Sequence, residues 1–232
     1  MRIDPRLFLP PPAVAEAIAA VAQNRQPFAL IRIGDGEALT LAQGTVRPWA
    51  YVAAKGFLRT AGVIVPDRAA RERVAFAVRH ADVVGVAARR DLPDFAPLTE
   101  EVFRYFGLAP RRICDCCINY ALQESGLLVP LLAGRRLFLV NRRWRAWAAA
   151  LRRLYGLEVI GGAGIDHCGQ AEAVLAAAAR HRFDFALLAA GVPATWRAVV
   201  LARRHRCVAL DLGRLADLMI DLCAAQERPG LN

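Results

Sequence analysis

The segment Phe28-Ala-Leu-Ile-Arg-Ile-Gly-Asp-Gly-Glu37 joins a short apolar run to a turn that carries two carboxylates. Its first six residues, 28–33, are apolar except for one arginine, which is typical of a strand buried in a sheet. The glycines on both sides of Asp35 give the backbone freedom to turn and to approach a ligand closely. The segment therefore predicts a buried strand that ends in an acidic turn.

The rest of the chain repeats this pattern of short apolar strands and amphipathic helices. Further strands are predicted at residues 83–87, 137–140, 157–160, 185–189 and 207–212. Helices are predicted at residues 13–25, 67–81, 144–155, 170–182 and 214–224, with another that starts near Pro193. This alternation indicates an α/β fold with a mainly parallel sheet and helices on both faces. Residues 44–66 are the least regular and form either a loop over a site or a small insertion.

Length and composition agree with a single domain over residues 1–232. The chain is 56% hydrophobic, which supplies one large core and excludes a disordered chain. The longest stretch without a charged side chain, residues 185–196, is too short for a membrane span, which needs roughly 20 residues. Asp4 and the prolines at 10–12 stand where a secretion signal would have its apolar region, so we expect no signal.

The six cysteines are few, and three of them crowd into residues 114–117, so they do not resemble a disulfide framework. We therefore expect a reducing, cytoplasmic location. A zinc site is disfavoured, because the paired C-x-x-C spacing is absent from the candidate ligands, which are Cys114, Cys116, Cys117, His167 and Cys168. Cysteines that pack as small hydrophobic residues are the favoured interpretation.

The net charge of +10 is spread over the whole sequence. This spread disfavours a nucleic-acid partner, which more often meets a concentrated basic patch. A phosphate-bearing substrate, or peripheral association with an acidic membrane surface, stays compatible with the charge. The basic-aromatic run at 142–147 places Trp144 and Trp147 on the apolar face of a predicted helix, so we expect them in the core.

Ligands of parallel sheets bind where the strands end, so the candidate segments are the residues at 34–37, 88–91, 141–143, 161–164, 191–195 and 211–214. A dinucleotide fingerprint is incomplete, because His167 stands where the third glycine belongs, and no P-loop or G-x-S-x-G motif is present. On an extended backbone Asp35 and Glu37 would point the same way and converge on one hard cation. A turn followed by a helix that starts near Glu37 is an equal alternative.

The stretch Arg32-Ile-Gly-Asp-Gly-Glu37 resembles the D-x-E motif of the GT-D type of glycosyltransferase. The resemblance continues at residues 81–85, in the run Ala186–Thr195 and in the strand end Ala209–Gly213, and so samples the chain from about residue 28 to 220. Three features depart from the family pattern. Val192 splits a Gly-Pro pair, Arg214 replaces a histidine, and the acidic-aromatic tail is not recognisable at residues 215–221.

The resemblance implies a Rossmann-like transferase that uses Mn²⁺ or Mg²⁺ and a nucleotide diphosphate sugar, most often UDP-glucose. Asp35 and Glu37 would be catalytic and hold the metal, which neutralises the departing diphosphate. The N–H groups of the helix near Pro193 would bind phosphate oxygens. The residues expected around the nucleotide sugar are Arg32, Gly34, Gly36, Asn141, Arg142, Gly191, Thr195 and Asp211.

Several of these residues have a plain structural alternative. Asn119 and Asn141 are each either a cap or turn residue or a sugar contact, and Asp211 either binds a hydroxyl or caps the last helix. Each arginine is either a phosphate ligand or a solvated surface group. Arg214 either pairs with a phosphate or carboxylate of the acceptor or faces water at a helix start.

The acceptor implied by the resemblance is a glycan, a glycoprotein or a lipid-linked sugar. Two other functions remain open. One is another nucleotide-using α/β enzyme, such as a methyltransferase, which would seldom need a cation. The other is an inactive member of the fold that binds a partner in glycan synthesis, against which the intact Asp35 and Glu37 argue weakly.

Overall fold

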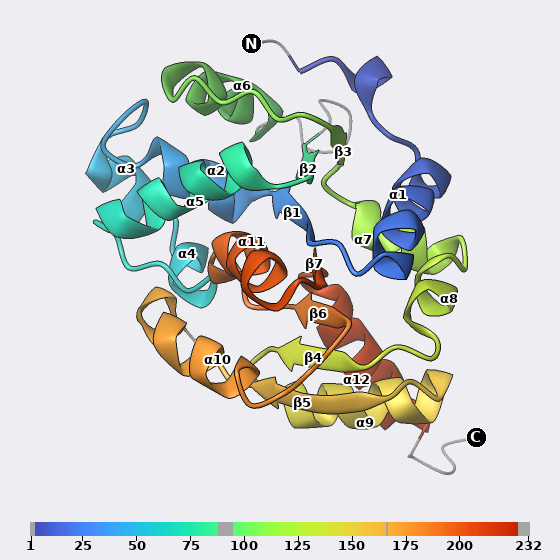
Figure 1. Cartoon of the computed structure of the whole chain (residues 1–232). Helices are drawn as coiled ribbons and strands as arrows, with labels where there is room; N and C mark the ends of the chain where they lie inside the picture. The colour runs from blue at the N-terminus through green and yellow to red at the C-terminus, as the bar shows by residue number, and fades with distance from the viewer. Residues whose placement is uncertain (1–2, 88–94, 166, 227–232) are drawn as a thin grey trace, which may run out of the picture.

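The computed structural model describes residues 3–87, 95–165 and 167–226, and one seven-stranded sheet runs through them (Figure 1). The order is β3-β2-β1-β7-β6-β4-β5, and every neighbouring pair is parallel. The strands are β1 (Phe28–Ile33), β2 (Val83–Val86), β3 (Ile113–Asp115), β4 (Leu137–Val140), β5 (Val159–Ala163), β6 (Phe185–Leu188) and β7 (Val208–Asp211). The expected parallel α/β sheet is therefore confirmed, with β3 as an unpredicted edge strand.

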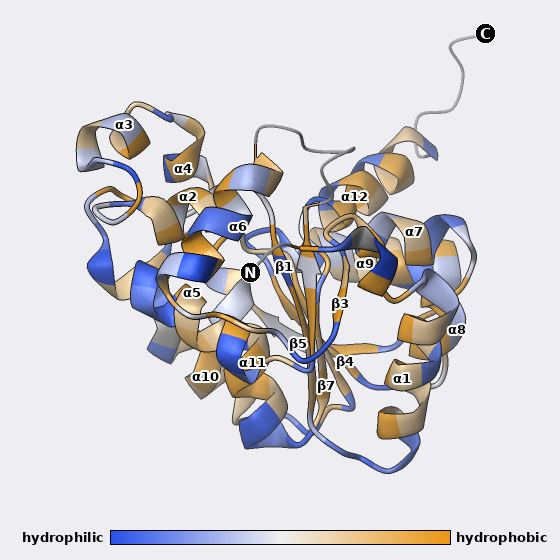
Figure 2. Cartoon of the chain, turned by 90° about the horizontal axis from the view of Figure 1, so that it is seen from above, coloured by the Kyte–Doolittle hydropathy of each residue, from blue (hydrophilic) through white to orange (hydrophobic). Residues whose placement is uncertain are grey.

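The sheet stands edge-on between two helix layers in Figure 2. One layer holds α2 (Asp35–Ala42), α5 (Arg68–His80), α6 (Phe95–Tyr105), α10 (Ala171–Ala178) and α11 (Pro193–His205). The other holds α1 (Pro11–Gln23), α7 (Ile118–Glu124), α8 (Leu128–Leu132), α9 (Trp144–Tyr155) and α12 (Leu215–Gln226). The irregular region at 44–66 forms two short helices, α3 (Trp49–Ala53) and α4 (Phe57–Thr60).

The strands are buried on both faces, and their side chains divide between two cores. On β1, Ile31 and Ile33 join the core under α5 and α11, whereas Phe28 and Leu30 join the core under α1 and α12. This division follows from the alternation of side chains along a strand. Trp147 on α9 is fully buried in the second core, so the tryptophans of the basic-aromatic run serve packing, as predicted.

Helix α5 begins where the sequence predicts it. The side chain of Asp67 accepts a hydrogen bond of 2.8 Å from the N–H of Ala70, which satisfies one of the free donors at the helix start. The strand β5 differs from its prediction at 157–160, because its central glycines give no apolar signal. The segment at 88–91 lies outside the described residues.

The strand order reverses between β1 and β7. The chain leaves β1 toward β2 and β3 on one side, while β7, β6, β4 and β5 lie on the other. Such a reversal opens a crevice at the carboxyl ends of the two central strands, where open α/β sheets bind ligands. Among the helices of the described residues, none has both the length and the apolar composition needed to cross a membrane.

Candidate active site at the carboxyl ends of β1 and β7

Arg32 on β1 connects the two sides of the crevice. Its Nε donates to the carbonyl oxygen of Asp211 over 3.1 Å, and one terminal nitrogen lies 3.6 Å from the Asp211 carboxylate. The other terminal nitrogen donates to the carbonyl oxygen of Cys116 over 3.1 Å. The guanidinium is therefore held by this chain's own β7 and by the segment after β3. It lies at the predicted site, but its present partners are internal.

The acidic turn is helical from Asp35 onward, because α2 starts at that residue. The prediction that Asp35 and Glu37 project together from an extended backbone is wrong, since helical residues two apart differ by about 200° in direction. Glu37 turns back and accepts the N–H of Gly34 over 3.0 Å. Asp35 is exposed, and its Oδ1 accepts the N–H of Gly36 over 2.7 Å. The alternative of a turn followed by a helix start matches the structure.

The carboxylate that interacts with Glu37 inside the crevice is Asp211. Burial, and then the negative charge of Asp211, raise the pKa of Glu37 to about 7, although Arg32 opposes the change. Burial also raises the pKa of Asp211, against the opposing effect of Arg32. Asp211 is only 3% exposed. One guanidinium thus lies beside two carboxyl groups whose ionised forms burial disfavours, and the charge of Asp211 further disfavours that of Glu37.

This arrangement fits a divalent cation. Mn²⁺ and Mg²⁺ prefer carboxylate oxygens, which Glu37 offers beside Arg32 and Asp211, whereas Asp35 lies on the exposed side of the helix start. A cation near Glu37 would stabilise the ionised form that burial and Asp211 now disfavour. Glu37 thus lies where a cation would be favoured, whereas the helical backbone does not direct Asp35 and Glu37 at one point, so a metal held by both residues stays a prediction.

Asn119 and Gly213, which were not among the residues expected around the nucleotide sugar, lie against Arg32. Asn119 at the start of α7 is buried, and its side chain donates to the carbonyl oxygen of Leu212 over 2.7 Å. Its Oδ1 lies 3.4 Å from Arg32. Gly213 has φ +49°, and a Cβ there would overlap the Arg32 guanidinium. Asn119 therefore joins the start of α7 to Leu212 and Arg32, and glycine at position 213 leaves room for the guanidinium.

The glycine loop before α11 packs against the chain itself. Gly191 has φ +60°, and a Cβ there would lie 2.5 Å from the carbonyl oxygen of Ala61, which accepts the N–H of Val192. Thr195 is buried in the first turn, as predicted, and its hydroxyl donates to the carbonyl of Val192. The expectation of free N–H groups here is wrong for Val192, Ala194 and Thr195, whose N–H groups all have partners within the chain.

The acidic turn and the glycine loop nevertheless lie side by side. A Cβ on Gly36 would lie 3.4 Å from the side chain of Val192 and 3.5 Å from that of Ala61. Gly34 and Gly36 thus bring the start of α2 to the loop before α11. The structure unites Arg32, Glu37 and Asp211 in one cluster and places this loop beside it.

A family model described as the GT-D fold-like domain matches residues 9–219. The chain belongs to the GT-D-like family. This membership supports the glycosyltransferase class that the sequence resemblance predicted. A comparison with curated proteins finds no match to the sequence.

Solved structures with the same fold include proteins of the domain of unknown function 1792. One, described as having a distinct glycosyltransferase fold, is 13% identical with a TM-score of 0.65, covering 90% of this chain and 78% of that one. Another, described as a new glycosyltransferase from Streptococcus sanguinis, is 15% identical with a TM-score of 0.59, covering 87% and 80%. At these identities the likeness establishes the fold alone.

In this GT-D-like chain the remaining predicted site residues lie away from the cluster. Asn141 follows β4, two strands from β7, and its side chain donates to the carbonyl of Ala189 over 2.6 Å while accepting the N–H of Arg143. It therefore shapes the turn before α9. Arg142 and Arg214 are exposed. Both arginines therefore lie on the surface, where a ligand could reach them from solvent.

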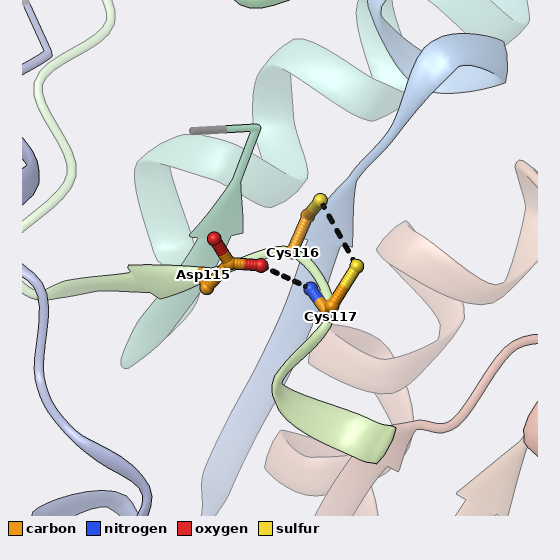
Figure 3. A group of neighbouring side chains, drawn as sticks. All are labelled: Asp115, Cys116 and Cys117. Carbon is orange, nitrogen blue, oxygen red and sulfur yellow. Dashed lines mark hydrogen bonds between the residues drawn. The ribbon is translucent and has the colours of Figure 1, made fainter. Parts of the chain in front are cut away.

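One group of three metal-ligating side chains lies within 4.8 Å in the described residues, namely Asp115, Cys116 and Cys117 (Figure 3). The Asp115 carboxylate accepts the N–H of Cys117 over 2.7 Å, and the two sulfur atoms are 4.0 Å apart. Burial raises the pKa of both thiols, which favours the protonated form that does not bind metal. Cys114 is buried in a core, so the five-residue zinc set is not brought together.

Proposed function

We propose that the chain transfers a sugar from a nucleotide diphosphate sugar, UDP-glucose or a close relative, to a glycan, glycoprotein or lipid-linked acceptor. Membership in the GT-D-like family supports the reaction class. The observation that carries the proposal is the cluster of Arg32, Glu37 and Asp211 at the reversal of strand order, where parallel sheets bind ligands.

In this proposal Asp35 and Glu37 hold Mn²⁺ or Mg²⁺ together with the donor diphosphate. The metal would supply positive charge where the leaving diphosphate gains negative charge. Glu37 is suited to the role because its carboxylate is half-buried and lacks a full counter-charge. Asp35 is exposed at the helix start and would approach the cation from solvent, on a different side from Glu37.

Arg32 and Asp211 act as one unit in the proposed donor site. Arg32 holds Asp211 through its carbonyl oxygen and its carboxylate, and the N–H of Gly213 donates to the same carboxylate. A buried carboxylate in this position is a strong acceptor for a ribose or acceptor hydroxyl. Gly34 and Gly36 bring the backbone close to the diphosphate, and Arg142 is a phosphate ligand from the rim.

The glycine loop and the turn after β4 complete the proposed site. Gly191 would lie beside the donor before α11, and the fully buried Thr195 would keep this loop in place through its hydrogen bond to Val192. Asn141 would approach the sugar only by exchanging a contact it now makes to Ala189 or Arg143. The cytoplasm is the location we propose, where six free cysteines are stable.

Thermal stabilisation by candidate ligands tests the proposal. UDP, GDP and S-adenosylmethionine are each added with MnCl₂ or with EDTA to the wild type and to Asp35→Asn. We expect UDP with Mn²⁺ to raise the melting temperature of the wild type most, and to lose that effect in EDTA and in the variant. Stabilisation by S-adenosylmethionine in EDTA would favour a methyltransferase instead. No response to any nucleotide would favour an inactive binding partner.

A further inference from the structure

A cavity lies at the amino ends of the parallel strands, which is the opposite end of the sheet from Arg32 and Asp211. Its volume is about 350 Å³, within the range of small-molecule sites. The cavity is formed by residues that directly precede β1, β4, β6 and β7. Six basic side chains line it, which are Arg25, Arg136, Arg182, Arg206, His181 and His205. This edge is across the sheet from Arg32 and Asp211, so its occupant would not be the proposed donor.

Asp184 is the one acidic residue in the cavity lining, and it is already paired. Arg136 donates to its two carboxylate oxygens over 2.9 and 3.2 Å and adds a backbone N–H bond of 3.0 Å. Arg25 lies near enough to lower the pKa of Asp184 further, after the larger effect of Arg136. The cavity lining thus contains one carboxylate and four guanidinium groups, so it keeps an excess of positive charge.

The backbone at two of these arginines gives an independent observation. Arg25 has φ +49° and Arg206 has φ +50°, and they are the only residues other than glycine with positive φ in the described part of the chain. Eight glycines take positive φ at other turns. Glycine adopts this conformation without strain, whereas a side chain with a Cβ does so at a cost. Both exceptions line the same basic cavity.

The end of α11 does not require Arg206. Basic side chains stabilise the last turn of a helix, but α11 already carries Arg203, Arg204 and His205 in its last turn. A glycine at position 206 would end α11 with less strain. The residue type at this position is therefore better explained by what the guanidinium faces, which is the cavity.

We propose that this cavity, here called the amino-edge cavity, binds a small phosphate-bearing anion with two or more negative charges. Guanidinium groups pair with phosphate oxygens through two parallel hydrogen bonds, which suits a ring of arginines around one volume. Arg25, Arg182 and Arg206 have no ion pair recorded among the described residues, so they are available for such a ligand. The proposal is independent of the transferase activity.

Calorimetric titration with pyrophosphate in EDTA tests the proposal. The wild type is compared with Arg206→Gly, because glycine keeps the positive-φ backbone conformation while the side chain that carries the guanidinium is removed. We expect the affinity for pyrophosphate to fall at least about tenfold, as for the loss of one charged hydrogen-bonding group. The melting temperature without pyrophosphate should stay equal or rise, which a merely structural arginine would not allow. Arg25→Gly provides a second variant with the same expectation.

Arg152→Ala is the matched control, because Arg152 is an exposed arginine of α9 outside the cavity lining. It removes the same charge and should leave the affinity unchanged. Equal losses in the control and in Arg206→Gly would show that net charge alone attracts the anion, and would overturn the proposal. No binding to the wild type, or full binding by both cavity variants, would overturn it too. Mn²⁺-dependent UDP binding measured on the same proteins reports on the donor site separately.

Discussion

At the carboxyl edge of the sheet two carboxyl groups, Glu37 and Asp211, lie beside one arginine, whereas at the amino edge the carboxylate of Asp184 lies beside at least two. The environments act in opposite directions. Burial raises the pKa values of Glu37 and Asp211, and the negative charge of Asp211 raises that of Glu37 further. The hydrogen bonds from Arg136 lower the pKa of Asp184. The ionised carboxylates are thus unfavourable at one edge and favourable at the other.

The carboxyl groups at the two edges therefore have different roles: one forms a stabilising ion pair, and the others are proposed to bind a ligand. The pair of Arg136 and Asp184 joins the starts of β4 and β6 and stabilises the fold. Glu37 and Asp211 lower the stability at neutral pH, and a fold retains such groups where a ligand offsets the cost. A divalent cation with a diphosphate would offset it at the carboxyl edge.

The largest expected effect is on catalysis. Asp35→Asn should lower kcat/KM for transfer or hydrolysis of UDP-glucose at least about 100-fold, because the charge that holds the metal is lost. Release of UDP with MnCl₂ present is the measurement. Asp184→Asn removes the same charge at the amino edge and should keep near-normal activity. If the two variants lose activity equally, the assignment of the metal to the carboxyl edge is wrong.

The next effect is on stability, and it has the opposite sign to the effect on activity. Glu37→Gln should raise the free energy of unfolding at pH 8 in EDTA by about 1–3 kcal/mol, because the amide carries no charge to bury. The folded-state pKa of Glu37, about 7, exceeds its ordinary value of 4.5. The stability that protonated Glu37 contributes to the wild type is therefore fully present below about pH 4.5 and is lost as the pH rises through 7.

Urea denaturation of both proteins between pH 4.5 and 8 measures this difference. The gain in the variant should be absent at pH 4.5 and complete by pH 8. A variant that is less stable than the wild type at every pH would show that the hydrogen bond to Gly34, rather than the charge, dominates.

Asp184→Asn should destabilise the protein by about 1 kcal/mol at pH 7, a value reduced for the partial exposure of the pair. The pKa of Asp184 is lowered in the folded state, so this stability is present above its ordinary value near 4 and is lost as the pH falls through the folded value. Denaturation at pH 7 and pH 3 is the measurement. A difference that persists undiminished at pH 3 contradicts the role of the ion pair.

The smallest expected effect concerns the acceptor. Arg214 is exposed just past the Asp211 strand end, and Arg214→Ala should raise the acceptor KM a few-fold with donor hydrolysis unchanged. Steady-state kinetics with the acceptor and without it separate the two quantities. Unchanged KM would leave Arg214 as a solvated helix-start residue.

Most of the sheet is predictable because its strands are apolar on both faces and its helices carry apolar stripes. The edge strand β3 could not be predicted, because it has only three residues, follows Arg111 and Arg112, and shows no apolar pattern of its own. The helical start at Asp35 is hidden for a similar reason, because a glycine-rich turn is compatible with both extended and helical backbone. Local pattern therefore fixes the elements better than the directions of side chains at their ends.

The strand order decides what the sequence cannot show. Arg32 and Asp211 are 179 positions apart and meet only because β1 lies next to β7. The basic residues at 25, 136, 182 and 206 are scattered along the sequence at unequal intervals, yet each lies shortly before a strand, so the parallel sheet gathers them at one edge. An even distribution of charge in sequence does not imply an even distribution on the surface.

Anomalous diffraction at the manganese edge, from crystals grown with MnCl₂ and UDP, tests the central claim most directly. We expect one manganese peak at coordination distance, about 2.2 Å, from a carboxylate oxygen of Asp35 or Glu37, with the UDP diphosphate beside it. Soaking with EDTA should remove both. A peak at Asp115 and the neighbouring cysteines, or UDP bound in the amino-edge cavity with the crevice between β1 and β7 empty, would contradict the account.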